Sequence, residues 1–528
     1  MRKPLALIAV LAVGAALLVP ATAMAAGEHT AEDVVVISSV DGTEIAITVF
    51  RPATASESAP VPVILHSHGW GGSRTATIGG EIEAFLDAGF GVVSIDQRGH
   101  GASGGEANVE DPDLEAEDID SVIDYVAGLS WVAKDLDSKG REVAGDPILG
   151  AIGGSYGGGY QTMAALDEIA EEGHTRFDAL APEITWYDLN ESLAPQGVPR
   201  TVWTSALFAA GAAMLPQYIQ EAFVWGAATG QWPDGTVLGE PTDGVPDLAS
   251  EFARHAPRFF SDQGIKLNIP VLQRQGISDN LFNLNQGLHI FRDVLTKKAR
   301  ARSLFVGYNG GHALPNAFPL GTAAGDDACS GDWTQLRIDF FKQAFAGQNP
   351  SSLLPARYNL TNVDGAKCLR FDRTATMRLE VDEDMGVAGL DSIATTTGAG
   401  APINLPVATG PLTVTGIPML KGVVDTVVPD SRVFFGLSLG TTPADAQVIQ
   451  NNLMPLRQML PAMGTEFNIE LPGVAVEVPE GQTLYLTITP VSDMFAAHGS
   501  RAPGAVVLTG LKLVLPGPLG KMMHIRSN

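Results

Sequence analysis

The chain has 528 residues, of which 45% are hydrophobic and 17% are charged, so it can build the cores of two or three domains. Its net charge of −26 at pH 7 argues against nucleic acid or an anionic membrane surface as a partner, because such a surface repels both. We therefore expect no nucleic-acid partner.

The N-terminus has the pattern of a secretory signal peptide. Arg2 and Lys3 precede the apolar run 4–19, and Ala23-Met24-Ala25 offers a cleavage site between small residues. The apolar run is short for a membrane span, and no charged stop-transfer flank or nearby cysteine follows it. We expect cleavage near Ala25, a mature chain of charge −28 without the two cations, and a secreted (extracellular or periplasmic) protein with no membrane anchor.

Strands and helices then alternate from residue 33 to residue 346. A hairpin around Asp41-Gly42 opens the series. The expected strands are 33–39, 44–51, 61–67, 91–95, 148–152, 177–184, 270–275 and 302–308, and the expected helices are 80–88, 115–127, 160–172, 285–297 and 333–345. This alternation predicts an α/β catalytic domain with a parallel sheet covered on both faces.

Residues 185–263 interrupt the alternation with a long, partly helical insert. Four of the seven tryptophans of the chain lie in it. Inserts at the carboxyl edge of such a sheet commonly form the lid and walls of a substrate pocket. We expect Trp186, Trp203 and Trp225 to line that pocket, although each ring could instead pack the insert onto the sheet.

The pattern changes again after a linker-like stretch at 347–352. Short apolar runs separated by Gly, Pro, Asp and Thr predict an all-β sandwich of the jelly-roll kind over 366–516, with runs at 376–381, 433–439, 467–471, 483–490 and 506–515.

In an exported protein the two cysteines, Cys329 and Cys368, are expected to form one disulfide that ties the end of the catalytic domain to the next region of the chain. Two buried free thiols are the alternative.

The run Gly153-Gly154-Ser155-Tyr156-Gly157 has the context of a nucleophile elbow. A strand precedes it and a helix follows it, which is the arrangement around the catalytic serine of an α/β-hydrolase. The Gly-x-Ser-x-Gly pattern also occurs around Ser103 and Ser438, but no helix follows either serine. We therefore predict Ser155 as the nucleophile.

A serine needs a base, and the base needs a carboxylate to orient it. In this fold the acid and the histidine follow the serine in sequence, each in a loop after a strand. Asp279 follows the strand 270–275, and His312 follows the strand 302–308. We predict Ser155, Asp279 and His312 as a catalytic triad, with Asp188 as the alternative acid.

Two backbone N–H groups are expected to hold the oxyanion. The first belongs to Tyr156, by the construction of the elbow, and the second to Trp70 in the loop 68–72. That loop could alternatively be only a flexible connection.

The acidic run 110–120 opens a helix and is interpreted as structural. We expect no metal site and no cofactor.

These residues resemble those of a known enzyme group. The elbow, the run Asp96-Gln97-Arg98-Gly99 and the acid loop 275–282 are similar to the corresponding segments of the Xaa-Pro dipeptidyl-peptidase (peptidase S15) and cocaine-esterase-like hydrolases. The resemblance covers about 33–516 and implies the same triad. Some members use a tyrosine hydroxyl as oxyanion donor, whereas this chain has His-Gly-Trp-Gly-Gly in that loop.

The sequence thus predicts a secreted serine hydrolase that forms an acyl-enzyme intermediate. Its partner would be a small-molecule ester or a peptide substrate, so that the activity is that of a carboxylesterase or of an Xaa-Pro dipeptidyl peptidase. The peptidase would need carboxylates near the pocket to hold a free α-amine. A carbohydrate-binding protein with a vestigial hydrolase domain is the third interpretation, against which a complete triad argues. The sequence sets no oligomeric state.

Overall fold

The computed structural model describes residues 28–312, 326–380, 392–396 and 401–518. The predicted signal segment, residues 1–25, lies outside the described residues, as does the last residue of the predicted strand 376–381. In the part of the chain that is described, no helix is both long enough and apolar enough to cross a bilayer.

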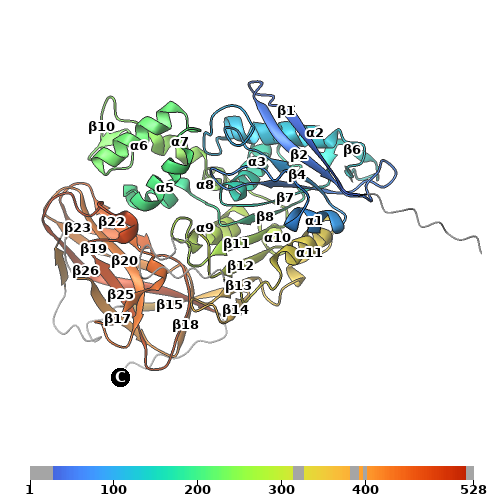
Figure 1. The fold of residues 1–528 in the computed structure, drawn as a ribbon. Helices are drawn as coiled ribbons and strands as arrows, with labels where there is room; N and C mark the ends of the chain where they lie inside the picture. The colour runs from blue at the N-terminus through green and yellow to red at the C-terminus, as the bar shows by residue number, and fades with distance from the viewer. Residues whose placement is uncertain (1–27, 313–325, 381–391, 397–400, 519–528) are drawn as a thin grey trace, which may run out of the picture.

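A ten-stranded mixed sheet forms the centre of the first part of the chain (Figure 1). In order across the sheet, the strands are β1 (Thr30–Ile37), β2 (Glu44–Arg51), β4 (Gly91–Ile95), β3 (Val63–Ser67), β7 (Leu149–Gly154), β8 (Ala179–Glu183), β11 (Leu272–Gly276), β12 (Leu304–Tyr308), β13 (Tyr358–Thr361) and β14 (Cys368–Phe371). The strands from β4 to β13 run parallel, whereas β1, β2 and β14 pair antiparallel at the edges. The predicted α/β architecture is confirmed.

The apolar runs of the central strands are buried because helices cover both faces of the sheet. In β3, Val63 and Leu65 pack into one hydrophobic core while Ile64 packs into the other. Helices α2 (Glu117–Ala127), α3 (Tyr156–Glu172) and α9 (Leu284–His289) supply the first core. Helices α1 (Gly80–Asp87) and α11 (Trp333–Phe345) supply the second, on the opposite face (Figure 1). Strands enclosed in this way appear as continuous apolar runs in the sequence.

Three details differ from the expected elements. The sheet continues past residue 346, where we expected the catalytic domain to end, because β13 and β14 complete its edge. The expected helix 285–297 is divided into α9, a π-helical turn (Ile290–Val294) and α10 (Lys297–Arg300), since the Thr296 side chain caps a new helix. A short hairpin of β5 (Lys134–Leu136) and β6 (Glu142–Pro147) precedes the elbow strand.

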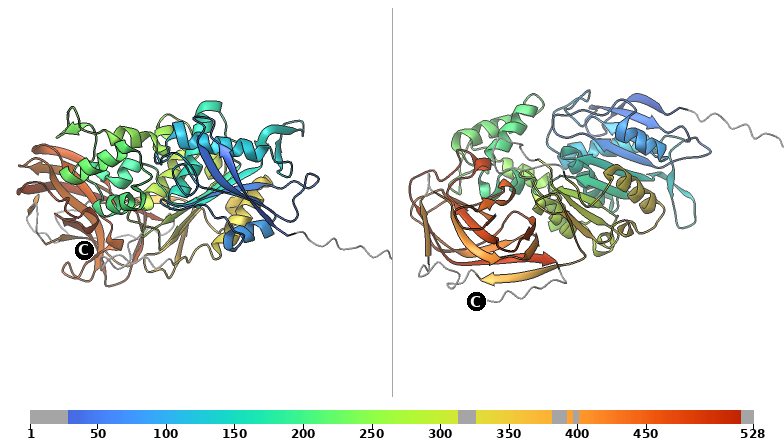
Figure 2. Two further views of the ribbon diagram at one scale, coloured as in Figure 1. Left: turned by 45° about the horizontal axis from the view of Figure 1, so that its top comes forward. Right: turned by 60° about the horizontal axis from the view of Figure 1, so that its bottom comes forward.

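The insert between β8 and β11 is largely helical. Its helices are α4 (Leu189–Leu193), α5 (Thr201–Gly211), α6 (Gln217–Thr229), α7 (Leu248–Arg254) and α8 (Pro257–Asp262), and the short strands β9 (Thr236–Val237) and β10 (Glu240–Pro241) form a hairpin within it. Figure 2 shows the insert in green above the carboxyl edge of the sheet, beside the C-terminal region in both views. Phe434 and Phe495 of that region share a hydrophobic core with the insert.

The C-terminal region consists of antiparallel sheets around a core of its own. One sheet contains β15 (Thr374–Glu380), β26 (Ala505–Pro518), β19 (Met419–Thr426), β23 (Ala462–Glu470) and β16 (Ser392–Thr396); the second contains β17 (Ile403–Thr409), β25 (Thr483–Thr489), β20 (Ser431–Gly440), β21 (Gln447–Val448) and β22 (Met454–Gln458); β18 (Leu412–Gly416) pairs with β24 (Val474–Val478). Leu420 of the first sheet and Leu486 of the second belong to one buried cluster, so the two sheets face each other. The predicted all-β region is confirmed.

Cys329 and Cys368 form a disulfide, as predicted. Cys329 precedes α11 and Cys368 begins β14, which belongs to the ten-stranded sheet. The disulfide therefore closes the edge of that sheet, and it does not link the sheet to the C-terminal sheets as we expected.

Candidate active site

Ser155 occupies a sharp turn between β7 and α3. Its backbone has φ 59° and ψ −120°, a left-handed conformation that is costly for a residue with a side chain. The turn closes tightly, since a Cβ atom added to Gly153 would lie 2.4 Å from the carbonyl oxygen of Gly157. The glycines on both sides of the serine are therefore required by this geometry, which is that of a nucleophile elbow.

The other two Gly-x-Ser-x-Gly serines are structural. Ser103 Oγ donates to the carbonyl oxygen of Asp96 at 2.6 Å and accepts from the N–H of Ala46 at 2.8 Å. Ser438 is buried in β20, where its hydroxyl contacts that of Thr487. Both hydroxyls are engaged within the fold, whereas Ser155 occupies the turn between a strand and a helix.

Ser155, His312 and Asp279 form a continuous hydrogen-bonded chain. His312 Nε2 lies 2.8 Å from Ser155 Oγ, and His312 Nδ1 lies 2.8 Å from Asp279 Oδ2. With Nδ1 donating to the carboxylate, Nε2 is left as the acceptor for the serine hydroxyl. The loop after β12 approaches so closely that a Cβ atom on Gly311, whose φ is 105°, would lie 2.6 Å from Asp279 Oδ2.

The Asp279 carboxylate is fully buried and saturated with donors. Its Oδ1 accepts from the N–H groups of Leu281 and Phe282, and its Oδ2 accepts from the N–H of His312 as well as from the imidazole. Asp188, the alternative acid, instead caps α4 by accepting from the N–H of Glu191 and pairs with Arg258. The structure thus places Asp279, not Asp188, at the histidine.

The loop that carries Trp70 lies directly beside the serine. A Cβ atom added to Gly69 would sit 3.7 Å from Ser155 Cβ. His68 shapes this loop, because its Nδ1–H donates to the Gly69 carbonyl and its Nε2 accepts from the N–H of Gln97. Burial lowers the pKa of His68, which keeps the ring neutral for these two roles. Tyr156 begins helix α3, where the first N–H groups have no partner within the helix.

An apolar pocket opens at Ser155 beneath the helical insert. Its volume is about 130 Å³, close to the size of cavities that hold a benzene ring (about 150 Å³). The walls come from α4, α5, α6 and α7 and from aromatic rings on both sides of the serine. Among the lining residues are Trp70, Tyr156, Trp186, Leu215, Phe223, Trp232, Phe252 and Phe282.

Of the tryptophans expected at the pocket, Trp186 lines it and Trp225 does not. Trp225 is half-buried on α6 and does not line the pocket. Trp203 does not line it either, but its ring stands edge-on to His312 with 5.8 Å between centroids. Trp70 and Trp232 line the pocket instead, and α6 contributes Ala222 and Phe223 to its wall.

The geometry agrees with comparisons to known proteins. A family model described as X-Pro dipeptidyl-peptidase (S15 family) matches residues 41–313, which is more than half of the chain. The chain belongs to this family. It is accordingly a hydrolase with an α/β-hydrolase fold and a C-terminal all-β region, and the resemblance drawn from its motifs is confirmed.

Solved structures extend this likeness over nearly the whole S15-family chain. An α-amino acid ester hydrolase matches with a TM-score of 0.63 at 15% identity, covering 95% of this chain and 99% of that one. A CocE/NonD family hydrolase from Staphylococcus aureus matches at 0.60 and 16% identity, covering 93% and 97%. An aminopeptidase from a marine sediment Thaumarchaeota archaeon matches at 0.60 and 13% identity, covering 93% and 96%. At these identities the likeness is one of fold.

Curated relatives match only a part of the chain. The uncharacterised protein YcjY of Escherichia coli K12 is 30% identical over 125 residues, which is 24% of this chain and 37% of that protein. An uncharacterised 31.7 kDa protein of Escherichia coli is 34% identical over 107 residues, or 20% and 33% of the two chains. The chain thus spans about a third of the length of these relatives.

Several residues at this S15-family site were not predicted. Asn280 of the acid loop accepts from Trp203 Nε1 at 2.8 Å through its side chain and from Arg200 Nη1 at 2.9 Å through its carbonyl oxygen. His498, from the C-terminal region, lines the pocket, and Asn452 reaches the backbone of Asp279. Asn280 lies in the acid loop 275–282, but Asn452 and His498 belong to no short motif, so only the tertiary structure identifies these two.

Proposed function

We propose that this protein is a serine esterase that cleaves esters with apolar acyl groups through an acyl-enzyme intermediate. The catalytic residues would be Ser155 as nucleophile, His312 as general base and acid, and Asp279 as the group that orients the histidine. The hydrogen-bonded chain Ser155–His312–Asp279 supports these roles, since each distance is 2.8 Å.

The reaction can be derived from these contacts. Ser155 Oγ attacks the ester carbonyl carbon and passes its proton to His312 Nε2, while Asp279 holds the Nδ1–H. The carbonyl oxygen becomes negatively charged and accepts from the backbone N–H groups of Tyr156 and Trp70. When the tetrahedral intermediate collapses, the C–O bond to the alcohol breaks and His312 returns the proton to the leaving alkoxide. Water then repeats these steps on the acyl-enzyme, which releases the carboxylic acid and restores Ser155.

The lining of the pocket is the reason for proposing an ester substrate and not a peptide with a free α-amine. Among the described residues, no Asp, Glu, Lys or Arg lines it, and its polar side chains are neutral. A dipeptidyl peptidase must pair the free α-amine of its substrate, because burying an unpaired ammonium group is strongly unfavourable. An apolar acyl chain instead gains from burial against these rings.

Xaa-Pro dipeptidyl peptidase activity is the second candidate, and membership of the S15 family favours it. Its substrates would place the proline ring in the apolar pocket and the amine near the pocket mouth. Binding of carbohydrate by a vestigial hydrolase is a third interpretation, disfavoured by the intact hydrogen-bonded chain at Ser155.

One comparison of substrates tests the proposal. Purified protein is assayed with p-nitrophenyl acetate and butyrate beside the p-nitroanilides of Ala-Pro and Gly-Pro. We expect ester turnover that Ser155→Ala abolishes, and no anilide turnover. Ser103→Ala, in the same sequence pattern, serves as the matched control and should retain labelling by a fluorophosphonate probe. Anilide turnover with inert esters would favour the peptidase, and labelling of the Ser155→Ala variant would refute the site.

Export from the cytoplasm is part of the same proposal. The N-terminal pattern of residues 1–25 and the Cys329–Cys368 disulfide support it, since disulfides persist in oxidising compartments. Mass spectrometry of protein recovered from the culture medium or periplasm is expected to give a chain that begins near Ala26. An intact N-terminus in the cytoplasm would contradict export and leave the esterase proposal standing.

A further inference from the structure

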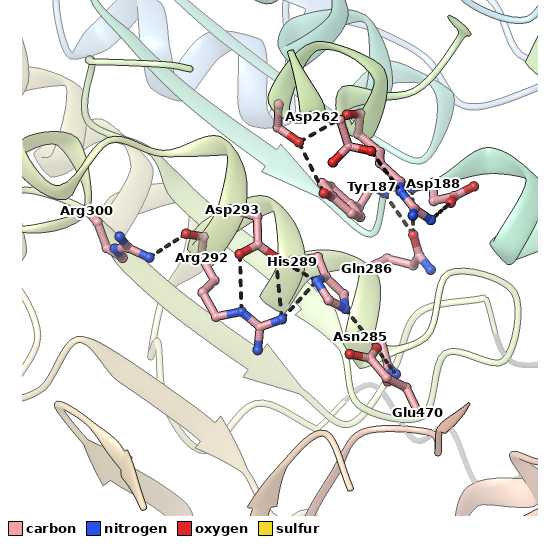
Figure 3. Close-up of polar contacts among 12 residues, drawn as sticks. Tyr187, Asp188, Asp262, Asn285, Gln286, His289, Arg292, Asp293, Arg300 and Glu470 are labelled. Atoms are coloured by element: carbon pink, nitrogen blue, oxygen red, sulfur yellow. Dashed lines mark hydrogen bonds and ion pairs between the residues drawn. The ribbon is translucent and has the colours of Figure 1, made fainter. Parts of the chain in front are cut away.

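A second, polar cavity lies where the helical insert meets the C-terminal region. It has a volume of about 650 Å³, which is in the range of small-molecule sites (roughly 300–1,000 Å³). Its walls come from α4, α8 and α9 and from the end of β23, and it shares no lining residue with the apolar pocket at Ser155. Figure 3 shows part of this cavity, with Glu470 of β23 facing the residues of α9.

The cavity is rich in carboxylates. Five of them line it, whereas its cationic side chains are Arg258, Lys266 and His289; the carboxylates are Asp188, Glu191, Asp262, Asp293 and Glu470. Arg258 donates to Asp188 at 2.7 Å and lies 3.3 Å from Asp262. The negative charges of these two carboxylates are thus paired with a cation of the protein itself.

His289 pairs with two more of the carboxylates that line the cavity. Its Nδ1 lies 2.7 Å from Asp293 and its Nε2 lies 2.8 Å from Glu470, so the imidazole bridges the helix α9 side to the C-terminal region (Figure 3). Burial by itself would lower the pKa of His289, but the hydrogen bonds that its ring donates to the two carboxylates outweigh burial and raise it. The ring also stacks on Tyr187 with 5.1 Å between centroids.

Glu191 is the carboxylate of this cavity that has no ion-pair partner among the described residues. Within the described part of the chain, its carboxylate makes no hydrogen bond and no ion pair. The nearby guanidinium of Arg200 does not pair with it, because Arg200 donates to the carbonyl oxygen of Asn280 and contacts Met454 Sδ. A half-buried carboxylate without an ion-pair partner would be stabilised by a ligand that carries a positive charge.

Asn283 provides an independent sign of a missing ligand. Its side chain is 2% exposed and lines the cavity, yet its Oδ1 has no hydrogen-bond partner. Asn283 stands at the N-cap of α9, where an asparagine usually accepts from the helix backbone, but it makes no capping bond. A buried amide oxygen left in this way is unfavourable because it has lost its bonds to water, so the cavity offers two acceptors, this oxygen and the Glu191 carboxylate, that have no partner within the described protein.

We propose that this cavity binds a small molecule with a protonated primary amine, which donates N–H hydrogen bonds to the Glu191 carboxylate and to Asn283 Oδ1. An ammonium group fits two acceptors in a roomy cavity, since it has three donors and one positive charge. A metal ion fits less well, because among the described residues the one group of ligands close enough to hold an ion is Glu117, Asp167 and Glu171, none of which lines this cavity. The site is separate from the proposed esterase reaction at Ser155.

Calorimetric titration with 1,4-diaminobutane tests the proposal, with 1,4-butanediol as the uncharged probe of the same length. The titration is run at pH 8 and low salt, because burial and the neighbouring Asp188 raise the pKa of Glu191 to about 7. We expect the diamine to bind the full-length protein in the millimolar range or tighter and the diol not to bind. Glu191→Gln should weaken binding of the diamine at least tenfold. Glu172→Gln makes the same charge change on an exposed residue of α3 and should leave the affinity for the diamine unchanged.

Three results would overturn the proposal: equal binding of diol and diamine, unchanged affinity in Glu191→Gln, or no heat of binding with the diamine up to roughly 20 mM. Circular dichroism melting of each variant establishes that it is folded. If Glu191→Gln does not fold, Asn283→Ser takes its place, since it removes the amide oxygen without changing the charge. Asn283→Ser should also weaken binding of the diamine.

Discussion

Asn452 Nδ2 donates a hydrogen bond of 2.9 Å to the carbonyl oxygen of Asp279. The two residues are 173 positions apart, and Asn452 is buried in the C-terminal region. Because Asp279 orients His312, the C-terminal region fixes the backbone of the very residue that holds the proposed catalytic base. The all-β region is therefore part of the support of the active site.

Removing this contact should slow the reaction without changing substrate binding. Asn452→Ala frees the acid loop, and small displacements of a catalytic group cost roughly 10–100-fold in rate. We expect kcat for p-nitrophenyl butyrate to fall about tenfold with KM nearly unchanged. Asn404→Ala is the matched control, because Asn404 donates to a carbonyl of its own region, that of Pro443. An unchanged kcat in Asn452→Ala would show that the contact is not needed.

Filling the apolar pocket should shorten the acyl chain that the enzyme accepts. Ala222 of α6 is buried and lines the pocket, so Ala222→Leu reduces its volume. We expect kcat/KM for p-nitrophenyl butyrate to fall by about 10–200-fold, while the acetate reacts normally. Val224→Leu, on the exposed face of the same helix, adds volume outside the pocket and should change neither substrate. An equal loss for both esters would contradict the assignment of this pocket to the acyl group.

The sequence was sufficient to predict the three residues of the hydrogen-bonded chain. Ser155, Asp279 and His312 each follow a strand directly, and the carboxyl ends of parallel strands meet at one edge of a sheet. The pocket walls obey no such rule. Whether Trp225 or Phe223 faces the serine depends on how α6 is rotated against the sheet, and periodicity fixes the angle between two residues on a helix but not that rotation.

Contacts between distant parts of the chain could not be predicted from the sequence either. Asn452 and His498 reach the site from the C-terminal region, and no spacing relates them to the elbow. Strands β13 and β14 were missed because strands of four residues carry little pattern, whereas the disulfide was predictable from a count of two cysteines in a chain that was predicted to be exported.

The Cys329–Cys368 disulfide should stabilise the edge of the ten-stranded sheet. It joins residues separated by 39 positions, and closing such a loop contributes about 3–4 kcal/mol in the chain-entropy model. The double variant Cys329→Ser and Cys368→Ser is expected to lower the unfolding free energy by about that amount in urea. Labelling of Ser155 by a fluorophosphonate below the transition should persist, since neither cysteine touches the site. Identical urea midpoints for variant and parent would refute the stabilising role.

A half-buried carboxyl group near the elbow strand makes stability depend on pH. Asp178 accepts from the N–H of Leu149 at the start of β7, and burial, together with the nearby Asp135 and Asp146, raises its pKa to about 7 from 3.8. The folded state therefore keeps the proton that the unfolded chain releases above about pH 4, and the unfolding free energy falls as the pH rises from about 4 to 7.

Asp178→Asn should remove this loss, because an amide keeps the acceptor for Leu149 and has no charge to bury. We expect the variant to gain stability relative to the parent as the pH rises from about 4 to 7 and to keep a constant advantage above that range, with a Tm roughly 2–4 °C higher at pH 8. Thermal melting at pH 4.5 and pH 8 measures the difference. Glu142→Gln, an exposed change on the neighbouring strand β6, is the control and should shift Tm equally at both pH values. A variant that is less stable than the parent at pH 8 would show that Asp178 is ionised in the folded state and that its charge is stabilised there.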